Sequence, residues 1–126
     1  MPDVLFIDAK FQVDVERIVL QRKFGITADI AESLDSARML LEAGTYGCVV
    51  LEPYDRNYYG REQEGPYFGF IGELKSRGIP VLIGSHYSEK EFQKAFGLTD
   101  YAGYKCKPWL DYELEDEVRR ILNGTK

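Results

Sequence analysis

The stretch Val4-Leu5-Phe6-Ile7 leads directly into Asp8, so that four apolar residues in a row end at a carboxylate. The arrangement recurs at Cys48-Val49-Val50-Leu51-Glu52, at Val81-Leu82-Ile83-Gly84-Ser85 and, in a weaker form, at Tyr104-Lys105-Cys106-Lys107. Short, continuous apolar runs are typical of strands buried on both faces, as in parallel α/β sheets. In such sheets, ligands bind beyond the carboxyl ends of the strands. We therefore expect two carboxylates, a hydroxyl and an ammonium to converge on one crevice.

Helix signals separate these runs. After the first run, Phe11, Val15, Ile18 and Val19 mark what we interpret as the apolar face of a helix that ends at Gly25. A second strand is expected over residues 26–30. Further helix signals are Ser33 as an N-cap, the Ser88/Glu91 capping box and Asp111 as the cap of a last helix.

Five strand–helix pairs in succession predict a parallel sheet, because each crossover is right-handed and covers one face of the sheet. The chain has 126 residues, which suffices for one domain spanning residues 1–126. No internal repeat or low-complexity segment interrupts the pattern.

The composition excludes several classes of function. A formal net charge of −5 argues against a nucleic-acid surface, which needs clustered Lys and Arg. No apolar run approaches the ~18 residues that span a bilayer, and the N-terminus lacks a signal-peptide core. Cys48 and Cys106 both fall in strands predicted to be buried, and His86 is the only histidine, so no zinc site is expected. Two lone thiols favour a cytoplasmic protein.

With these features in place, the chain resembles the receiver domain of bacterial and archaeal two-component response regulators over essentially its whole length. The resemblance rests on strands that end in Asp8, Glu52 and Ser85, in register with the pair Lys107-Pro108. It implies a flavodoxin-like (βα)5 three-layer sandwich with a parallel sheet of order 2-1-3-4-5. Tyr104 matches the aromatic position that rotates when family members are activated.

The chain departs from the family at two positions of the phosphorylation pocket. Receivers carry an acidic pair after the first strand, whereas here Ala9 follows Asp8 and cannot supply the second carboxylate ligand for magnesium. The phosphoacceptor is normally Asp, and the matching residue here is Glu52. Ser85 and Lys107 keep the hydroxyl and the ammonium that contact the phosphoryl group in the family. The resemblance thus implies a degenerate pocket with no cofactor beyond weak magnesium binding at Asp8 and Glu52.

These two changes impair the chemistry for physical reasons. Magnesium demands near-octahedral oxygen ligation, which the loss of an acid weakens. The extra methylene of Glu52 displaces its oxygens by about 1 Å, and such a misplacement can cost ~100-fold in rate. Two hypotheses then explain Glu52. In the first, its carboxylate mimics a phosphoryl oxygen near Ser85 and Lys107. In the second, it only pairs with Lys107 and keeps a buried ammonium satisfied.

A second departure is the stretch from Pro53 to Tyr67, which is several residues longer than the corresponding loop of ordinary receivers. Long loops inside compact domains tend to be functional. Its tyrosines and arginines suit an interface, but they would also suit a lid packed over the pocket. The tyrosines are Tyr54, Tyr58, Tyr59 and Tyr67.

Two further aromatic residues border the same carboxyl-end face and are candidates for a switch or an interface. We expect Tyr104 to be a half-buried packing residue and Trp109 to lie partly in the core.

The function that these residues favour is that of an atypical receiver, a pseudo-receiver, which acts by protein–protein contact and is not an enzyme. The resemblance implies a kinase, another regulator or a second copy of the chain as the partner. The alternative is a phosphorelay receiver that accepts phosphate on Glu52 or Asp55 from a histidine kinase. A small enzyme or nucleotide binder lacks support, because Ala9-Lys10-Phe11-Gln12 stands where a Gly-rich phosphate loop would be needed. We expect no output domain, since the sequence ends soon after the last helix.

Overall fold

The computed structural model describes residues 2–53, 64–97, 100–110 and 112–124. Strands and helices alternate strictly along these residues. In chain order they are β1 Val4–Ile7, α1 Lys10–Phe24, β2 Ala28–Ala31, α2 Leu34–Ala43, β3 Cys48–Leu51, α3 Glu64–Ser76, β4 Val81–Ser85, α4 Glu89–Phe96, β5 Gly103–Cys106 and α5 Glu113–Leu122. None of the described helices combines the length and the apolar character that a bilayer crossing requires.

The described strands form one parallel sheet of order β2-β1-β3-β4-β5, which confirms the predicted topology. The first and third strands have the bounds that the apolar runs indicated, whereas β2 is shifted two residues towards the C-terminus at its start. β3 lies at the centre, and β1 pairs with it in register from Val4 opposite Cys48 to Ile7 opposite Leu51. All residues of β1, β3 and β4 are buried, as expected for interior strands of a parallel sheet.

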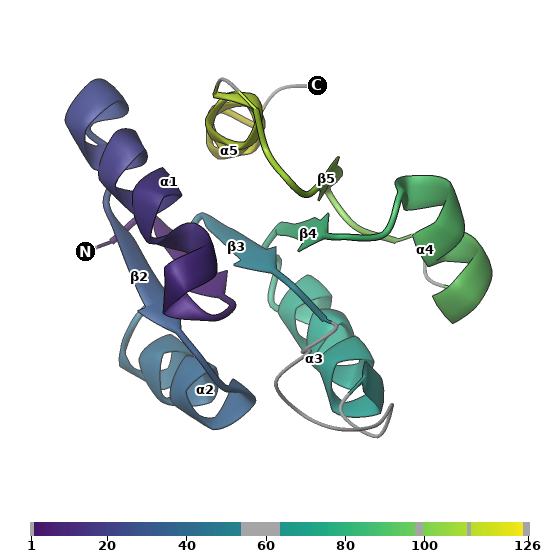
Figure 1. Cartoon of the computed structure of the whole chain (residues 1–126). Coiled ribbons are helices and arrows are strands. Elements are labelled where there is room, and N and C mark those ends of the chain that lie inside the picture. The colour runs from purple at the N-terminus through teal and green to yellow at the C-terminus, as the bar shows by residue number, and fades with distance from the viewer. Residues whose placement is uncertain (1, 54–63, 98–99, 111, 125–126) are drawn as a thin grey trace.

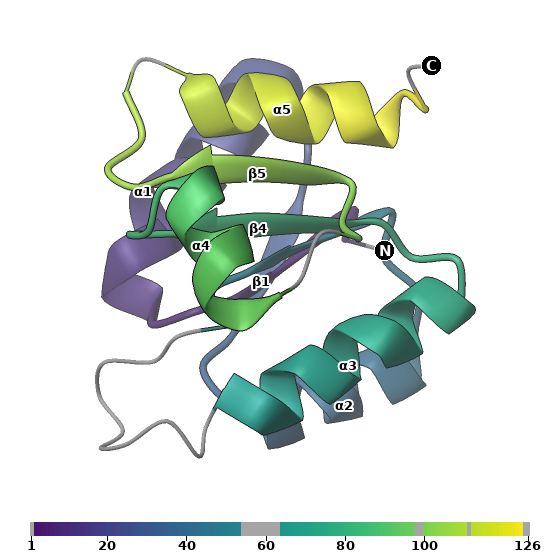
Figure 2. The same ribbon diagram turned by 90° about the vertical axis from the view of Figure 1, so that its right-hand side faces the viewer.

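The molecule has three layers (Figure 1, Figure 2). Helices α1 and α5 cover one face of the sheet, and α2 and α3 cover the other, with α4 beside β5 on that second side. Each face has its own apolar core: Val13, Leu20 and Val118 belong to the first, while Leu41, Leu74 and Phe92 belong to the second. The sheet is therefore held rigidly between two cores, which fixes the positions of the strand ends.

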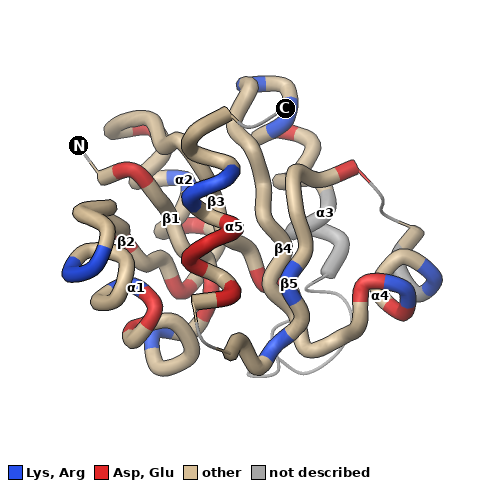
Figure 3. The backbone as a smooth tube through the Cα atoms, turned by 90° about the horizontal axis from the view of Figure 1, so that it is seen from above, with Lys and Arg blue, Asp and Glu red and all other residues tan. Residues whose placement is uncertain are grey.

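Local signals set most helix ends as predicted. Gly25 ends α1 in the left-handed conformation, with φ of 67°. Ser33 and Ser88 both cap their helices through capping boxes. The predicted cap Asp111 lies outside the described residues, and α5 follows Tyr112. Acidic residues occupy the first turn of α5 and arginines the last, which complements the helix dipole (Figure 3).

The predicted apolar face of α1 was wrong. Phe11 is 75% exposed and Val15 66% exposed, while the buried residues of the helix are Val13 and Leu20. Apolar residues are spread around this helix, so periodicity alone does not identify one face. The face that meets the sheet is set by the short connection after Asp8, which fixes where the helix begins.

Two other expectations also need correction. Cys106 is exposed, not buried, because it is the last residue of the edge strand β5, whereas Cys48 is buried in β3. Both thiols are free, in agreement with strands separated by β4. The loop predicted to run to Tyr67 ends earlier, since α3 begins at Glu64. Pro66 is tolerated there because the first turn of a helix has no intrahelical partners for its N–H groups.

Candidate functional site

Asp8 and Glu52 lie side by side at the carboxyl edge of the sheet. Each stands one residue beyond its strand, and the backbone pairing continues to it: the N–H of Asp8 donates to the carbonyl of Ala31, and the N–H of Glu52 donates to the carbonyl of Ile7, both at 3.1 Å. The two carboxylates therefore start from fixed points on adjacent strands. This confirms that the strand ends bring them together.

Lys107 reaches both carboxylates from the end of β5. Its Nζ lies 2.5 Å from Oδ2 of Asp8 and 3.4 Å from Oε1 of Glu52. The three side chains are nearly buried, with exposed fractions of 4% for Lys107, 9% for Asp8 and 7% for Glu52. One ammonium thus stands between two carboxylates, with Asp8 as its closer partner.

Burial decides how much this cluster matters. Exposed ion pairs contribute ~0–1 kcal/mol, because water screens them. A buried pair gains little over an apolar replacement, yet removal of one partner costs about 3–5 kcal/mol, because the remaining charge is left uncompensated. The Asp8–Lys107–Glu52 cluster belongs to the second class. Each side chain of the cluster therefore stabilises the fold mainly by compensating a buried charge of opposite sign.

Ser85 is the fourth residue predicted for the pocket, and it lies at the end of β4. Its side chain is buried, and its Oγ accepts a hydrogen bond from the N–H of Tyr87 at 3.3 Å. Its carbonyl accepts the N–H of Lys107 at 2.7 Å, which ties the end of β5 to the end of β4. The hydroxyl is at the predicted edge of the sheet, and its described hydrogen bond organises the loop that leads to α4.

Tyr104 is half-buried, as expected, and packs from β5 against Phe92 of α4. Its hydroxyl donates to the carbonyl of Tyr87 at 2.7 Å, and its ring centroid lies 5.3 Å from that of Phe92 and 5.8 Å from that of Tyr101. Burial raises the pKa of the Tyr104 hydroxyl well above its ordinary value, and the neighbouring Ser85 hydroxyl partly offsets this. Tyr104 therefore stays a protonated donor that fastens the β4–α4 connection to β5.

Trp109 lies partly in the core, as predicted, and its ring lies beside the Lys107 ammonium. Its Nε1 donates to the carbonyl of Lys105 at 3.1 Å, and Nζ of Lys107 lies 5.4 Å from the ring centroid. A Cβ atom at Gly84 would come within 2.6 Å of the Trp109 ring, so the close approach of ring and strand requires glycine there. The peptide bond between Lys107 and Pro108 is cis.

Ala9 occupies the position after Asp8 and starts α1 without a side-chain cap. Its N–H donates to Oδ1 of Asp8 at 2.7 Å, which orients the Asp8 carboxylate with Oδ2 towards Lys107. Both oxygens of Asp8 are thus engaged by the protein itself.

Two acidic residues near the pocket were missed in the sequence. Glu16 on α1 is close enough to be coupled to Lys107 and Asp8, and burial raises its pKa. Glu115 on α5 is only 5% exposed, and its pKa is raised by burial and also by the charge of Glu16. Glu16 lies three residues after Val13 on the buried face of α1, so a correct choice of that face would have revealed it.

The predicted role of the tyrosine-rich stretch, as an interface or a lid, stays untested. Tyr54, Tyr58 and Tyr59 lie outside the described residues, as does the alternative phosphoacceptor Asp55. Tyr67 lies in α3, but its side chain is outside the description. An interface and a lid both remain predictions for this segment.

Solved structures of receiver proteins match nearly the whole chain. A response regulator receiver protein from Burkholderia phymatum is 24% identical, with a TM-score of 0.70 over 98% of this chain and 96% of its own. An orphan response regulator of H. pylori is 23% identical, with a TM-score of 0.69 over 99% and 97%. The receiver domain of a sensor histidine kinase from Pseudomonas aeruginosa, which has a magnesium ion coordinated in its active-site cleft, is 12% identical, with a TM-score of 0.71 over 97% and 98%.

Neither a protein-family model nor a curated protein matches the sequence. At these identities the structural likeness establishes the fold. The chain has the fold of response-regulator receiver domains, as the resemblance implied.

Proposed function

We propose that this chain is an atypical receiver that signals by binding another protein, with a pocket held by fixed ion pairs and not switched by phosphorylation. The observation that carries the proposal is the Lys107 ammonium, which lies between the buried carboxylates of Asp8 and Glu52. Two adjacent buried carboxylates require a positive charge. Lys107 supplies it, and so reduces the attraction of the pocket for a divalent cation.

The oxygen ligands that the pocket offers are too few for strong magnesium binding. Magnesium requires near-octahedral oxygen ligation at short distances. Ala9 adds no side-chain oxygen, and both oxygens of Asp8 are engaged. Within the described parts of the chain, no three His, Cys, Asp or Glu side chains are grouped so as to hold a metal ion. These residues do not fit the magnesium centre that the receiver fold implies.

The geometry of Glu52 supports the absence of a phosphorelay. Phosphoryl transfer depends on in-line positioning of the attacking oxygen and on neutralisation of the charge on the transferred group. Oε1 of Glu52 faces the Lys107 ammonium in a site that is almost closed to solvent. In this proposal Glu52 is a permanent partner of Lys107, and its negative charge does not change with a signal.

One observation favours the alternative phosphorelay function. Ser85 and Lys107, which contact the phosphoryl group in receivers, both stand at the strand ends where the fold requires them. The phosphate would then be carried by Glu52 or Asp55. The experiment below separates the two functions.

The test is phosphorylation with a small-molecule donor, together with magnesium titration. Trp109 is the only tryptophan of the chain and borders Lys107, so its fluorescence reports on the pocket. We expect no label from acetyl phosphate, and no change in fluorescence across the millimolar range of magnesium. The double change Ala9→Asp with Glu52→Asp should restore magnesium-dependent labelling, and Glu52→Asp alone should restore less, because a metal ligand is still missing.

The matched control is Ala9→Asn with Glu52→Gln, which changes the same positions without adding acids and should stay unlabelled. Efficient, acid-labile labelling of the unmodified protein at Glu52 or Asp55 would overturn the proposal in favour of the phosphorelay. Failure of the repaired variant to take label would show that the defect lies elsewhere than at these two positions.

A further inference from the structure

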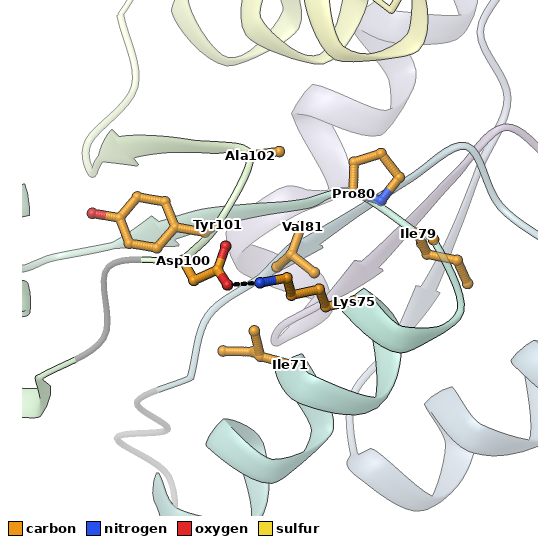
Figure 4. A pocket seen from close by; sticks show the side chains of 9 residues that line it. Ile71, Lys75, Ile79, Pro80, Val81, Asp100, Tyr101 and Ala102 are labelled. Atoms are coloured by element: carbon orange, nitrogen blue, oxygen red, sulfur yellow. Dashed lines mark hydrogen bonds and ion pairs between the residues drawn. The ribbon is translucent and has the colours of Figure 1, made fainter.

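A pocket of about 300 Å³ lies at the end of the sheet opposite the Lys107 cluster, where β4 and β5 begin. The second half of α3 forms one wall, the first residue of β4 lies at the base, and residues 100–102 form the other wall (Figure 4). Ligand pockets of proteins have volumes of about 300–1,000 Å³, so this one suits a small molecule.

The base of the pocket is apolar and rigid. Ile71, Ile79 and Val81 line it, and all three are buried members of the core that β4 shares with α3. Tyr101 also lines the pocket, and its hydroxyl is held by a hydrogen bond to Glu89 at 2.7 Å. Because these side chains are fixed by packing and hydrogen bonding, the pocket is largely pre-formed, as binding sites usually are.

Two opposite charges meet at the mouth of this apolar base. Lys75 extends from α3 towards Asp100, and the two form an ion pair (Figure 4). Their side chains are 64% and 62% exposed, so the pair is solvated. An exposed ion pair of this kind contributes little and can open at small cost. Both charged groups are therefore accessible to a ligand that carries a carboxylate and an ammonium.

We propose that this pocket binds a small zwitterion with an apolar side chain, that is, an α-amino acid of the leucine or phenylalanine type. The apolar side chain lies against Ile71 and Val81 and is thereby removed from water. The ligand carboxylate pairs with Lys75 and the ligand ammonium with Asp100, in place of the ion pair that these residues form with each other. A ligand with only one charge leaves one of the two residues without its new partner.

The test is titration of the whole protein with L-leucine, followed by the methyl NMR signals of Ile71, Ile79 and Val81. The charge requirement is tested with two singly charged analogues. N-acetyl-leucine keeps only the carboxylate, and leucine amide keeps only the ammonium. We expect leucine to bind more tightly than either analogue, by about three- to tenfold, the range typical of one charged contact near the surface.

Variants should then divide the two contacts. Lys75→Met should weaken the binding of N-acetyl-leucine but not that of leucine amide, while Asp100→Asn should do the reverse. Ala102→Phe adds a bulky side chain at an exposed residue of the pocket wall and should block all three ligands. Arg38→Met removes an ion pair of similar exposure between α2 and α3 and serves as the matched control with unchanged binding.

Leucine that causes no shift of these methyl signals at millimolar concentration would overturn the proposal. So would equal affinity for leucine and for the doubly blocked N-acetyl-leucine amide, because the pocket would then select an apolar group without reading its charges.

Discussion

Replacing Lys107 with Met tests the charge cluster most directly. The change keeps much of the length of the side chain but removes the ammonium, so that Asp8 and Glu52 remain next to each other with exposed fractions of only 9% and 7%. A buried charge that loses its partner costs about 3–5 kcal/mol in the free energy of unfolding. For a domain of this size, that corresponds to a fall in the thermal midpoint of about 10–20 °C.

The destabilisation caused by removing each carboxylate should follow its distance to the Lys107 ammonium. Asp8→Asn removes the 2.5 Å partner and should cost about 2–4 kcal/mol. Glu52→Gln removes the 3.4 Å partner while Asp8 still compensates Lys107, and should cost about 1–3 kcal/mol. The expected order of destabilisation is therefore Lys107→Met, then Asp8→Asn, then Glu52→Gln.

The pH dependence adds an independent check on Lys107→Met. Without the ammonium, the two neighbouring carboxylates raise each other's pKa in the folded state, so the folded variant binds a proton that the unfolded chain has released. Its free energy of unfolding should then rise as the pH falls from neutral towards 5. The loss relative to the unmodified protein should be smaller at pH 5 than at pH 8.

Urea unfolding followed by circular dichroism at each pH gives these free energies, with an unchanged slope as the check on two-state behaviour. Lys75→Met is the matched control, since it removes the ammonium of an ion pair that is 64% and 62% exposed and should cost less than ~1 kcal/mol. A loss below ~1 kcal/mol in the free energy of unfolding for Lys107→Met at pH 8 would refute the reasoning. Two buried carboxylates without a compensating cation should destabilise the fold by more than that.

Three further predictions address the helices and the thiols. Leu20→Ala should cost about 2–5 kcal/mol in urea unfolding, whereas Phe11→Ala should change the free energy by less than ~0.5 kcal/mol; equal effects would contradict the orientation of α1. The pKa of Glu115 is raised in the folded protein, so its contribution to stability declines as the pH rises through that pKa. Glu115→Gln should therefore stabilise the protein more at pH 7 than at pH 4. The opposite trend would contradict the raised pKa of Glu115. Cys106 should react rapidly with a thiol reagent, and Cys48, with a pKa raised to about 12 by burial, only on unfolding; fast labelling of both would speak against the burial of Cys48.

The strand ends could be read from the sequence because two constraints act together there. A run such as Val4–Ile7 suits a strand buried on both faces, and the first polar residue after it marks the end of that strand. Since all strands are parallel, those polar residues share one edge. Asp8, Glu52, Ser85 and Lys107 could therefore be expected at the ends of their strands, where the structure has them, without any knowledge of the helices.

The facing of α1 could not be read in the same way. Its sequence offers apolar residues both at Phe11 and Val15 and at Val13 and Leu20, and the choice between these faces depends on the direction in which the chain leaves Asp8. That direction is a tertiary property with no local signal. The same uncertainty hid Glu16, because a residue's proximity to Lys107 follows from the face on which it lies.

The two departures from the receiver pattern can be understood as one change in charge. An acidic pair after the first strand and an acid after the third give three carboxylates around one lysine, a set that favours a divalent cation. With Ala9, the set is reduced to Asp8 and Glu52. A single ammonium can then stand between the remaining carboxylates at 2.5 and 3.4 Å. The longer side chain of Glu52 fits the same logic, because it extends its carboxylate beyond β3 towards Lys107. In the proposed atypical receiver, the missing ligand and the lengthened acid thus both favour a pocket in which Lys107, and not a metal ion, compensates the two carboxylates.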